Sequence, residues 1–155
     1  MRTFETWMEQ YGESHQNPTN QIIHKIMVPL IMWTILGLMW EIPTPTFMHD
    51  YAFLNWSTLF GVGCMIFYLT LNFKMFVGMI FMIVPMYLSI YYLAQMPEVS
   101  LWKLMLIVFV IAWIFQFVGH KIEGKKPSFL DDLAFLLIGP LWVLRSFYKV
   151  FGINV

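Results

Sequence analysis

The chain has 155 residues, of which 59% are hydrophobic, 19% are aromatic and only 12% are charged, and its net charge is zero. This composition lies far outside the averages of soluble domains and is typical of a protein embedded in a bilayer. No basic stripe indicates nucleic acid binding, and the length suits one domain, 1–155. The lone Cys64 lies in an apolar run, which excludes a disulfide framework and a cysteine zinc site.

The N-terminal twenty residues hold Glu5, Glu9 and Glu13 and no apolar core, so no cleaved signal peptide is expected there. A short N-terminal helix is expected instead. The next helix should start at Asn17-Pro18, with Asn17 as the N-cap and Pro18 at the first helical position, where its missing N–H costs nothing.

Four stretches are long and apolar enough to cross a hydrocarbon core about 30 Å thick, which needs about 20 helical residues. They lie at about 22–40, 51–71, 75–93 and 101–118. A fifth apolar run contains Gly139-Pro140 and is too short to span, so an interfacial or re-entrant helix is expected over about 128–148. The predicted fold class is all-α: an integral membrane bundle of four transmembrane helices, flanked by the N-terminal and C-terminal helices.

Charge predicts the orientation of this bundle. With four spans, eight of the nine Lys and Arg residues fall on the side that carries both termini, and Lys103 alone falls on the other. The positive-inside rule then places both termini in the cytoplasm. The compact length and the lack of retention or targeting signals favour a bacterial inner membrane over the endoplasmic reticulum.

The same topology brings three of the four histidines together. His15, His24 and His120 share the cytoplasmic face, whereas His49 follows the first span and belongs to the opposite face, roughly 30 Å away. Asn20 lies four residues before His24, on the same side of its helix. On the last span, Gln116, His120 and Glu123 form one helical stripe at spacings of four and three residues.

Two interpretations of this group remain open from the residues alone. The histidines could anchor the helices at the headgroups, with Asn20 and Gln116 joining neighbouring helices. They could instead bind a metal, because three neutral imidazoles, with or without a carboxylate, suit iron or zinc. Lys121, Lys125 and Lys126 fit positive-inside anchors, and Asp131 and Asp132 fit the first turn of the last helix, beginning at Ser128. The spacing of these candidate ligands alone does not identify a reaction.

Two sequence blocks resemble a known family. The first is His15-x-Asn17-Pro18-x-Asn20-x-x-x-His24 followed by Val28-Pro29, and the second is Trp113-x-x-Gln116-x-x-Gly119-His120 with Glu123, Pro127 and a late Gly139-Pro140-Leu-Trp. Together they resemble the small membrane 2-hydroxy fatty acid dioxygenases, which include a fungal enzyme that makes odd-chain fatty acids and its bacterial relatives.

This resemblance implies an iron(II)-dependent α-oxidation, in which O₂ is used to cleave the C1–C2 bond of a long-chain 2-hydroxy fatty acid and leave a fatty acid one carbon shorter. It implies that His15, His24 and His120 are iron ligands and that Glu123 is a fourth ligand or orients an imidazole. Asn20 and Gln116 are expected to support the ligands or to contact the substrate hydroxyl. The alternatives are a metal-dependent membrane lipid hydroxylase or hydrolase, and a non-catalytic lipid-binding membrane protein.

Overall fold

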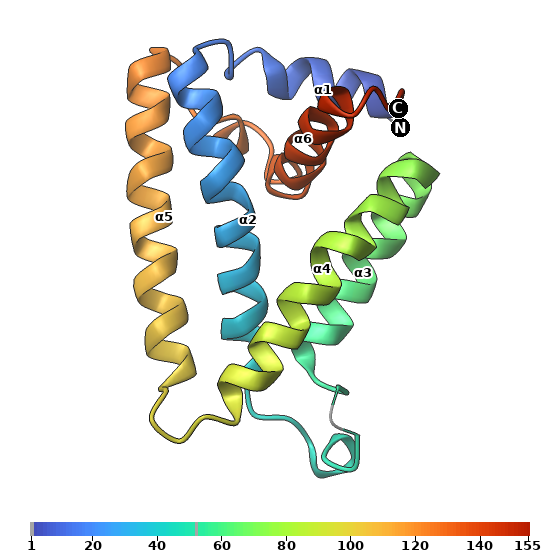
Figure 1. The fold of residues 1–155 in the computed structure, drawn as a ribbon, viewed down its shortest axis with the longest axis vertical. Helices are drawn as coiled ribbons and strands as arrows, with labels where there is room; N and C mark the ends of the chain where they lie inside the picture. Colours follow the sequence, from blue (N-terminus) through green and yellow to red (C-terminus); the bar gives the residue numbers. More distant parts are fainter. Residues whose placement is uncertain (1, 52) are drawn as a thin grey trace.

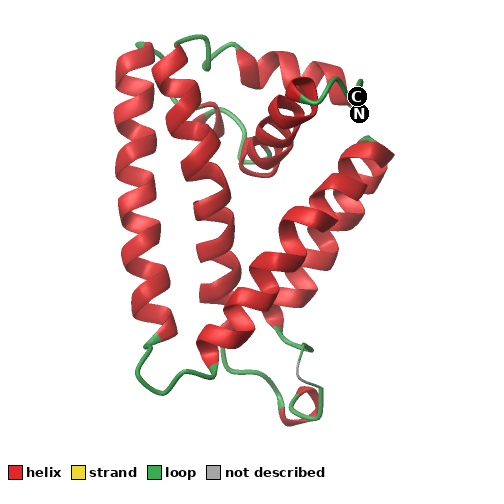
Figure 2. Cartoon of the chain, in the orientation of Figure 1, coloured by secondary structure: helices red, strands yellow, loops and turns green. Residues whose placement is uncertain are grey.

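The computed structural model describes residues 2–51 and 53–155, and within them every regular element is helical, as Figure 2 shows. This confirms the all-α class. The α-helices in chain order are α1 (Phe4–Gly12), α2 (Pro18–Trp40), α3 (Trp56–Leu71), α4 (Phe73–Ala94), α5 (Leu101–Glu123) and α6 (Phe135–Val150), and two short 3₁₀ turns cover Thr46–Met48 and Ser128–Leu130.

The beginnings of the helices follow from local capping. Asn17 caps α2 by accepting a hydrogen bond from the Thr19 N–H, and Pro18 takes the first helical position, which confirms the start predicted from the sequence. Asn72 ends α3 and caps α4, where its side chain accepts from the Met75 N–H. Helices α3 and α4 therefore form a hairpin with a one-residue turn.

Three helices, α2, α4 and α5, are long and apolar enough to cross a membrane, and α3 is a shorter apolar helix of 16 residues. The span expected at 51–71 begins only at Trp56, because Asn55 accepts a hydrogen bond from the Thr58 N–H and fixes the helix start there. Position 52 of that expected span lies outside the described residues. At about 1.5 Å per residue, α3 is about 24 Å long, less than a hydrocarbon core.

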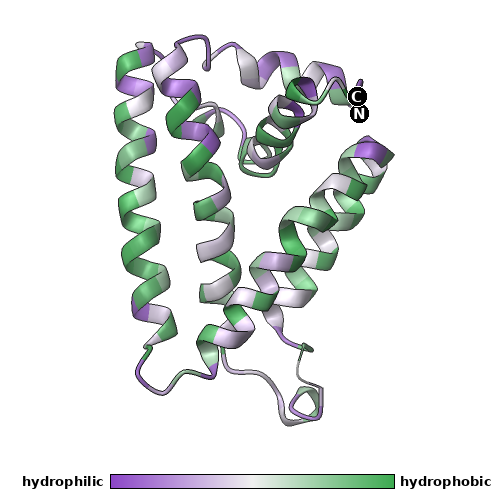
Figure 3. Cartoon of the chain, viewed as in Figure 1, coloured by the Kyte–Doolittle hydropathy of each residue, from purple (hydrophilic) through white to green (hydrophobic). Residues whose placement is uncertain are grey.

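Helices α2 and α5 lie side by side along their length, and the α3–α4 hairpin leans away from them (Figure 1). The two chain ends, α1, α6, the start of α2 and the end of α5 gather at one end of the bundle, called here the terminal end. The segments at 41–51, 53–55 and 95–100 lie at the opposite end, called here the loop end. Apolar residues cover the four long helices, and polar residues concentrate at the two ends (Figure 3).

The last helix differs from its prediction at its start. The segment expected as one helix over about 128–148 is divided, with a 3₁₀ turn at Ser128–Leu130 and then α6 from Phe135. Asp132 causes the division, because its carboxylate accepts from the Ala134 N–H and competes with helical hydrogen bonding. Neither Asp131 nor Asp132 therefore lies in the first turn of a helix beginning at Ser128.

Helix α6 is packed into the bundle and closes the space between α2 and the hairpin. Ile138, Leu141 and Val143 are fully buried, and the ring of Phe135 meets Trp7 of α1 edge to face, with ring centroids 5.1 Å apart. A second apolar cluster, formed by Leu36, Ile90, Leu101 and Met105, fills the bundle toward the loop end. The cavity described below lies between the packing around α6 and this second cluster.

Candidate metal centre

Three buried imidazoles meet at the terminal end of the bundle. His15 comes from the segment between α1 and α2, His24 from the second turn of α2 and His120 from the last turn of α5. One ring nitrogen from each lies within 4.8 Å of the other two, and the Nε2 atoms of His24 and His120 are 3.1 Å apart. Ligand nitrogens about 2.1 Å from one metal and at about 90° to each other lie about 3 Å apart, so the rings are close to a coordinating arrangement.

Backbone carbonyls fix the tautomers of two of these rings. His15 Nδ1 lies 2.6 Å from the carbonyl oxygen of Tyr11, and His24 Nδ1 lies 3.0 Å from that of Asn20. A carbonyl only accepts, so both Nδ1 atoms carry the hydrogen and both Nε2 atoms present lone pairs toward the cluster.

These lone pairs are the observation that fits a metal ion. His15 Nε2 is buried and has no hydrogen-bond partner among the described residues, and His120 Nδ1, on the third ring, likewise has none. A buried acceptor without a partner costs about 1–3 kcal/mol, and a cation bound by His15 Nε2 would remove that cost. The donor set, three imidazoles without a thiolate, suits iron or zinc.

The surroundings of His15 hold its ring rigidly and keep it neutral. The ring stacks on Tyr11 with centroids 4.2 Å apart, and Trp142 of α6 lies 5.2 Å away on a tilted plane. Ser14 Oγ lies 3.1 Å from His15 Nδ1 and 2.6 Å from Ser128 Oγ. Burial lowers the pKa of His15 to about 4, which leaves the ring neutral at physiological pH, as metal binding requires.

Glu123 ties the end of α5 to the segment that carries His15. Its two carboxylate oxygens accept from the backbone N–H groups of Gln16 and Asn17, both at 2.8 Å, and from the side-chain amide of Asn20 at 3.1 Å. Both oxygens are thus engaged at the N-terminus of α2, and Glu123 lies beside the histidine cluster without joining it.

Close approach of α2 and α5 depends on a glycine. A Cβ atom added to Gly119 would lie 2.3 Å from Oδ1 of Asn20 and 3.5 Å from the His24 ring. Asn20 is fully buried and its Oδ1 has no partner among the described residues, while its amide donates to Ser14 O and Glu123. Only a residue without a side chain lets α5 bring His120 beside His24.

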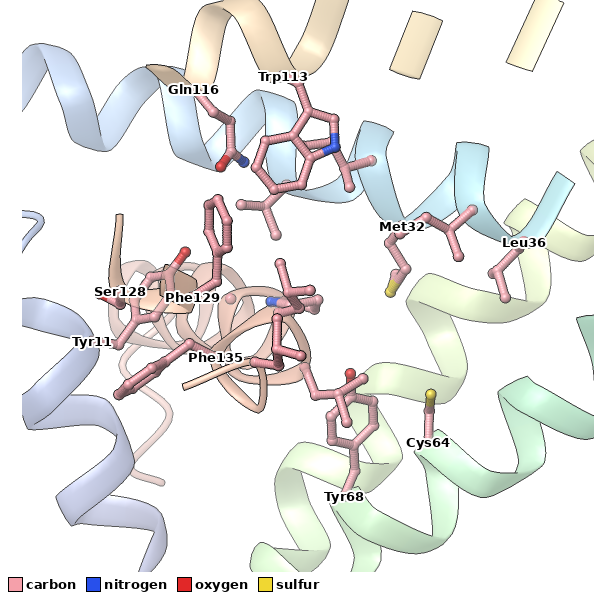
Figure 4. A pocket seen from close by; sticks show the side chains of 18 of the residues that line it. Tyr11, Met32, Leu36, Cys64, Tyr68, Trp113, Gln116, Ser128, Phe129 and Phe135 are labelled. Carbon is pink, nitrogen blue, oxygen red and sulfur yellow. The ribbon is translucent and has the colours of Figure 1, made fainter. Parts of the chain in front are cut away.

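An apolar cavity of about 300 Å³ extends from the histidines into the bundle (Figure 4). This volume is at the lower end of the range for ligand pockets, about 300–1,000 Å³. His15, His120, Gln116 and Ser128 line its polar end, and the rest of the wall is almost entirely apolar, with residues from α2, α3 and α6. The cavity also has a lateral opening, because Phe60, Leu133 and Leu136 both line it and are exposed on the side of the bundle.

Gln116 and Trp113 extend the α5 stripe into this cavity. Gln116, one turn from His120, is only 6% exposed, and its amide forms no hydrogen bond with the described residues. The indole N–H of Trp113 is likewise buried without a partner there. Figure 4 shows both side chains on the cavity wall, so both offer unused hydrogen-bonding groups near the histidines.

The structure therefore brings together the residues that the sequence selected. His15, His24, Asn20, His120 and Glu123 form one contiguous group, and Gln116 lies at its edge. His49 is outside this group, in the loop after α2, where its Nε2 lies 3.1 Å from the Thr44 carbonyl oxygen. Of the lysines, Lys125 donates to the Glu13 carbonyl, and Lys121 and Lys126 are exposed.

Four residues of the site were missed by sequence reasoning: Tyr11, Ser14, Ser128 and Trp142. Tyr11 lies four residues before His15, a spacing that places it one helical turn away and could have indicated it. Trp142 belongs to the Gly139-Pro140-Leu-Trp block, but its contact with His15, like the contact of Ser128 with Ser14, is tertiary and has no local signal in the chain.

Comparison with known proteins found a matching family and a similar protein. The family described as 2-hydroxy-palmitic acid dioxygenase Mpo1-like matches residues 1–151. The 2-hydroxy-palmitic acid dioxygenase MPO1 of Saccharomyces cerevisiae is 27% identical over 144 residues, which cover 92% of this chain and 78% of the yeast protein. No solved structure matches the chain.

Removal of one imidazole should abolish metal binding. We expect anaerobically purified wild-type protein to carry one transition-metal ion per chain, and His24→Ala or His120→Ala to reduce the content to background, because two neutral nitrogens hold an ion far more weakly than three. Elemental analysis measures this. The control is His49→Ala, which removes a histidine far from the cluster and should leave the metal content unchanged. Full metal content in His24→Ala or His120→Ala would show that the histidines serve another role.

Glu123→Ala should weaken metal binding by about 10–100-fold, because the residue orients the segment that carries His15. It should also destabilise the metal-free protein by about 1–3 kcal/mol, since two backbone N–H groups and one amide lose a charged acceptor. Thermal unfolding in detergent with a chelator measures the second effect, and Glu98→Ala, an exposed acid at the loop end, is the control. A metal-free melting temperature unchanged by Glu123→Ala would instead favour direct ligation by Glu123.

Proposed function

Because the chain belongs to the Mpo1-like family of 2-hydroxy-palmitic acid dioxygenases, we propose that it is an iron(II)-dependent dioxygenase that shortens long-chain 2-hydroxy fatty acids by one carbon. The observation that carries the proposal is the position of the three-imidazole cluster, two of whose members, His15 and His120, line the polar end of an apolar cavity. An amphiphilic acid fits this combination, with its head at the histidines and its chain in the cavity.

His15, His24 and His120 would hold the iron as three neutral ligands. When bound, iron(II) would supply a Lewis-acid and redox centre for the oxidation of the substrate head by O₂. Glu123 supports His15 through the backbone of Gln16 and Asn17, and the Tyr11 and Asn20 carbonyls hold two rings in the tautomer that ligation needs.

The protein groups at the cavity mouth would orient the substrate head. Gln116 lies at the polar end of the cavity, where its amide can donate a hydrogen bond to the 2-hydroxyl or the carboxylate of the substrate. The apolar wall beyond it excludes water from the reacting carbons, which protects the chemistry from side reactions. Ser14 and Ser128, hydrogen-bonded to each other beside His15, close the site at the polar end of the cavity.

The reaction balances with O₂ as the sole oxidant. One 2-hydroxy acid and one O₂ give the acid shortened by one carbon, one CO₂ and one water. The bond between C1 and C2 breaks, C2 is oxidised from an alcohol to a carboxyl carbon, and C1 leaves as CO₂. The substrate loses four electrons and O₂ accepts four, so no external reductant is needed.

The whole chain would lie in the membrane with four crossings. Helices α2 and α4 both run from the terminal end to the loop end (Figure 1), and α3 connects the end of one to the start of the other. If α2, α4 and α5 cross, α3 must carry the chain back across, although it is shorter. Eight of the nine cationic side chains then lie at the terminal end, which would face the cytoplasm of a bacterial inner membrane.

Turnover of a defined substrate tests the activity. Anaerobically purified, iron-loaded protein mixed with 2-hydroxypalmitic acid and O₂ should consume O₂ and release pentadecanoic acid, and His120→Ala should reduce the rate at least about 100-fold through loss of the metal. Mass spectrometry with ¹⁸O₂ should find label in the shortened acid. Product without label would indicate hydrolysis, a product of unchanged chain length would indicate hydroxylation, and iron-loaded protein that leaves the substrate intact would refute the proposal.

Topology has an independent test. In a Cys64→Ala background, single cysteines at Gln16 and Lys126 should react with a membrane-impermeant thiol reagent only when the cytoplasmic face is open, and a cysteine at Thr44 only from the opposite face. The reason is that positions 16 and 126 lie at the terminal end and position 44 at the loop end. Labelling of positions 16 and 44 from the same face would contradict the crossing of α2.

A further inference from the structure

The cavity below the histidines ends inside the bundle, at a floor that includes Leu36 of α2 and Gly61 and Cys64 of α3. We propose that this floor limits the length of the acyl chain and that Leu36 and Cys64 determine which chain lengths the enzyme accepts. The inference rests on the proposed function, since it assigns the cavity to the chain of a 2-hydroxy fatty acid whose head lies at the three imidazoles.

The depth of the cavity can be measured along α2. The histidines that line the polar end of the cavity, His15 and His120, lie beside His24 of this helix, and the cavity-lining residues of α2 itself are apolar: Val28, Ile31, Met32, Ile35 and Leu36. Leu36 is twelve residues beyond His24, which is about 18 Å at a rise of about 1.5 Å per residue. An extended chain of single bonds advances about 1.2 Å per bond, as the dimensions of an extended backbone show. The cavity therefore accommodates about 15 bonds, or a chain of about 16 carbons.

Close packing lies directly beyond the floor. Leu36 is only 3% exposed and belongs to the apolar cluster with Ile90, Leu101 and Met105, of which Ile90 and Met105 are completely buried. A Cβ atom added to Gly37 would lie 2.5 Å from the sulfur of Met105, so α2 and α5 are already in contact there. A longer chain would have to displace this core, and packed interiors resist such insertion.

Cys64 provides the space opposite Leu36. Figure 4 shows both side chains at the end of the cavity farthest from Ser128 and Tyr11, on facing helices. Cysteine is small, and a larger side chain at this position would occupy space that the end of the acyl chain otherwise fills. The lateral opening at Phe60, Leu133 and Leu136 offers a competing path, because a chain tail that left there would never reach the floor.

Two substitutions should shift the chain-length preference in opposite directions. The substrates are saturated 2-hydroxy fatty acids of about 10 to about 20 carbons, a range around the length that the cavity predicts. Cys64→Phe should move the maximum of kcat/KM to shorter chains and reduce it for the longest by more than about tenfold, since each excluded methylene is worth about fourfold in binding. Leu36→Ala should move the maximum to longer chains. Cys64→Leu should give a smaller shift of the same sign as Cys64→Phe, and it provides the narrowing variant if phenylalanine prevents folding.

The matched control is Ile66→Phe, which adds the same ring to α3 at a side chain that is 59% exposed and does not line the cavity. Its profile should equal that of the wild type. Wild-type rates that are equal at all chain lengths, or folded Cys64 and Leu36 variants with the wild-type profile, would overturn the proposal and indicate that the tail leaves through the lateral opening.

A binding measurement separates this inference from the proposed function. Without O₂, the same acids at equal concentration should raise the melting temperature of iron-loaded protein in the order of their affinities, with the same optimal length and the same shifts in the variants. Protein that shows this length-dependent stabilisation but oxidises none of the acids would refute the proposed function and leave the assignment of the floor intact. Turnover of the acids without any dependence on chain length in either measurement would support the proposed function and refute the assignment of the floor.

Discussion

The carboxylate of Glu123 and the backbone N–H groups of Gln16 and Asn17 form the contact on which the site depends. Helices α2 and α5 could bring His24 and His120 together by their own packing, but His15 lies on irregular chain between two helices. Gln16 and Asn17 directly precede α2, so their N–H groups have no helical acceptor, and a carboxylate at this position is also stabilised by the helix dipole. Glu123 accepts from both N–H groups and thereby holds His15 beside the other rings.

Unused hydrogen-bonding capacity at helix ends also orients the imidazoles. The last carbonyls of α1 have no helical partner, and Tyr11 O accepts from His15 Nδ1, while Gly12 O accepts from the His15 N–H. Within α2, Asn20 O lies one turn before His24 and fixes that ring in the same manner. In a chain of this size, backbone carbonyls perform the orienting role that carboxylates often perform around metal-bound histidines.

The outline of the site could be predicted from the sequence because it depends on helix periodicity and on the even number of long helices from α2 to α5. An odd number of helices between the start of α2 and the end of α5 would have separated His24 from His120, and the spacings within each helix place Asn20 and Gln116 on the histidine faces. The start of α3 was not readable in this way. Tyr51 and Phe53 continue the apolar composition, and only the Asn55 cap shows where the helix begins.

Contacts between distant segments could not be predicted either, because they depend on how α6 packs into the bundle. Ser128 meets Ser14, and Trp142 meets His15, across more than a hundred residues, and both depend on where α6 enters the bundle. That entry is determined by the Asp132 turn, which divides the segment that hydropathy treats as one helix. Hydropathy measures how well a segment tolerates lipid and contains no information on which segment fills the space between α2 and the α3–α4 hairpin.

The position of α6 connects the packing to the chemistry. If the hairpin packed against α2 along its whole length, no cavity would remain below the histidines; because it leans away, α6 and the 3₁₀ turn before it occupy part of the gap and leave the rest open. The buried face of α6 supports the hairpin through Ile138 and Leu141, while Phe135 and Pro140 line the cavity. One helix therefore both stabilises the tilt of the hairpin and shapes the space that the tilt creates, so substitutions on its buried face should affect folding and ligand binding together.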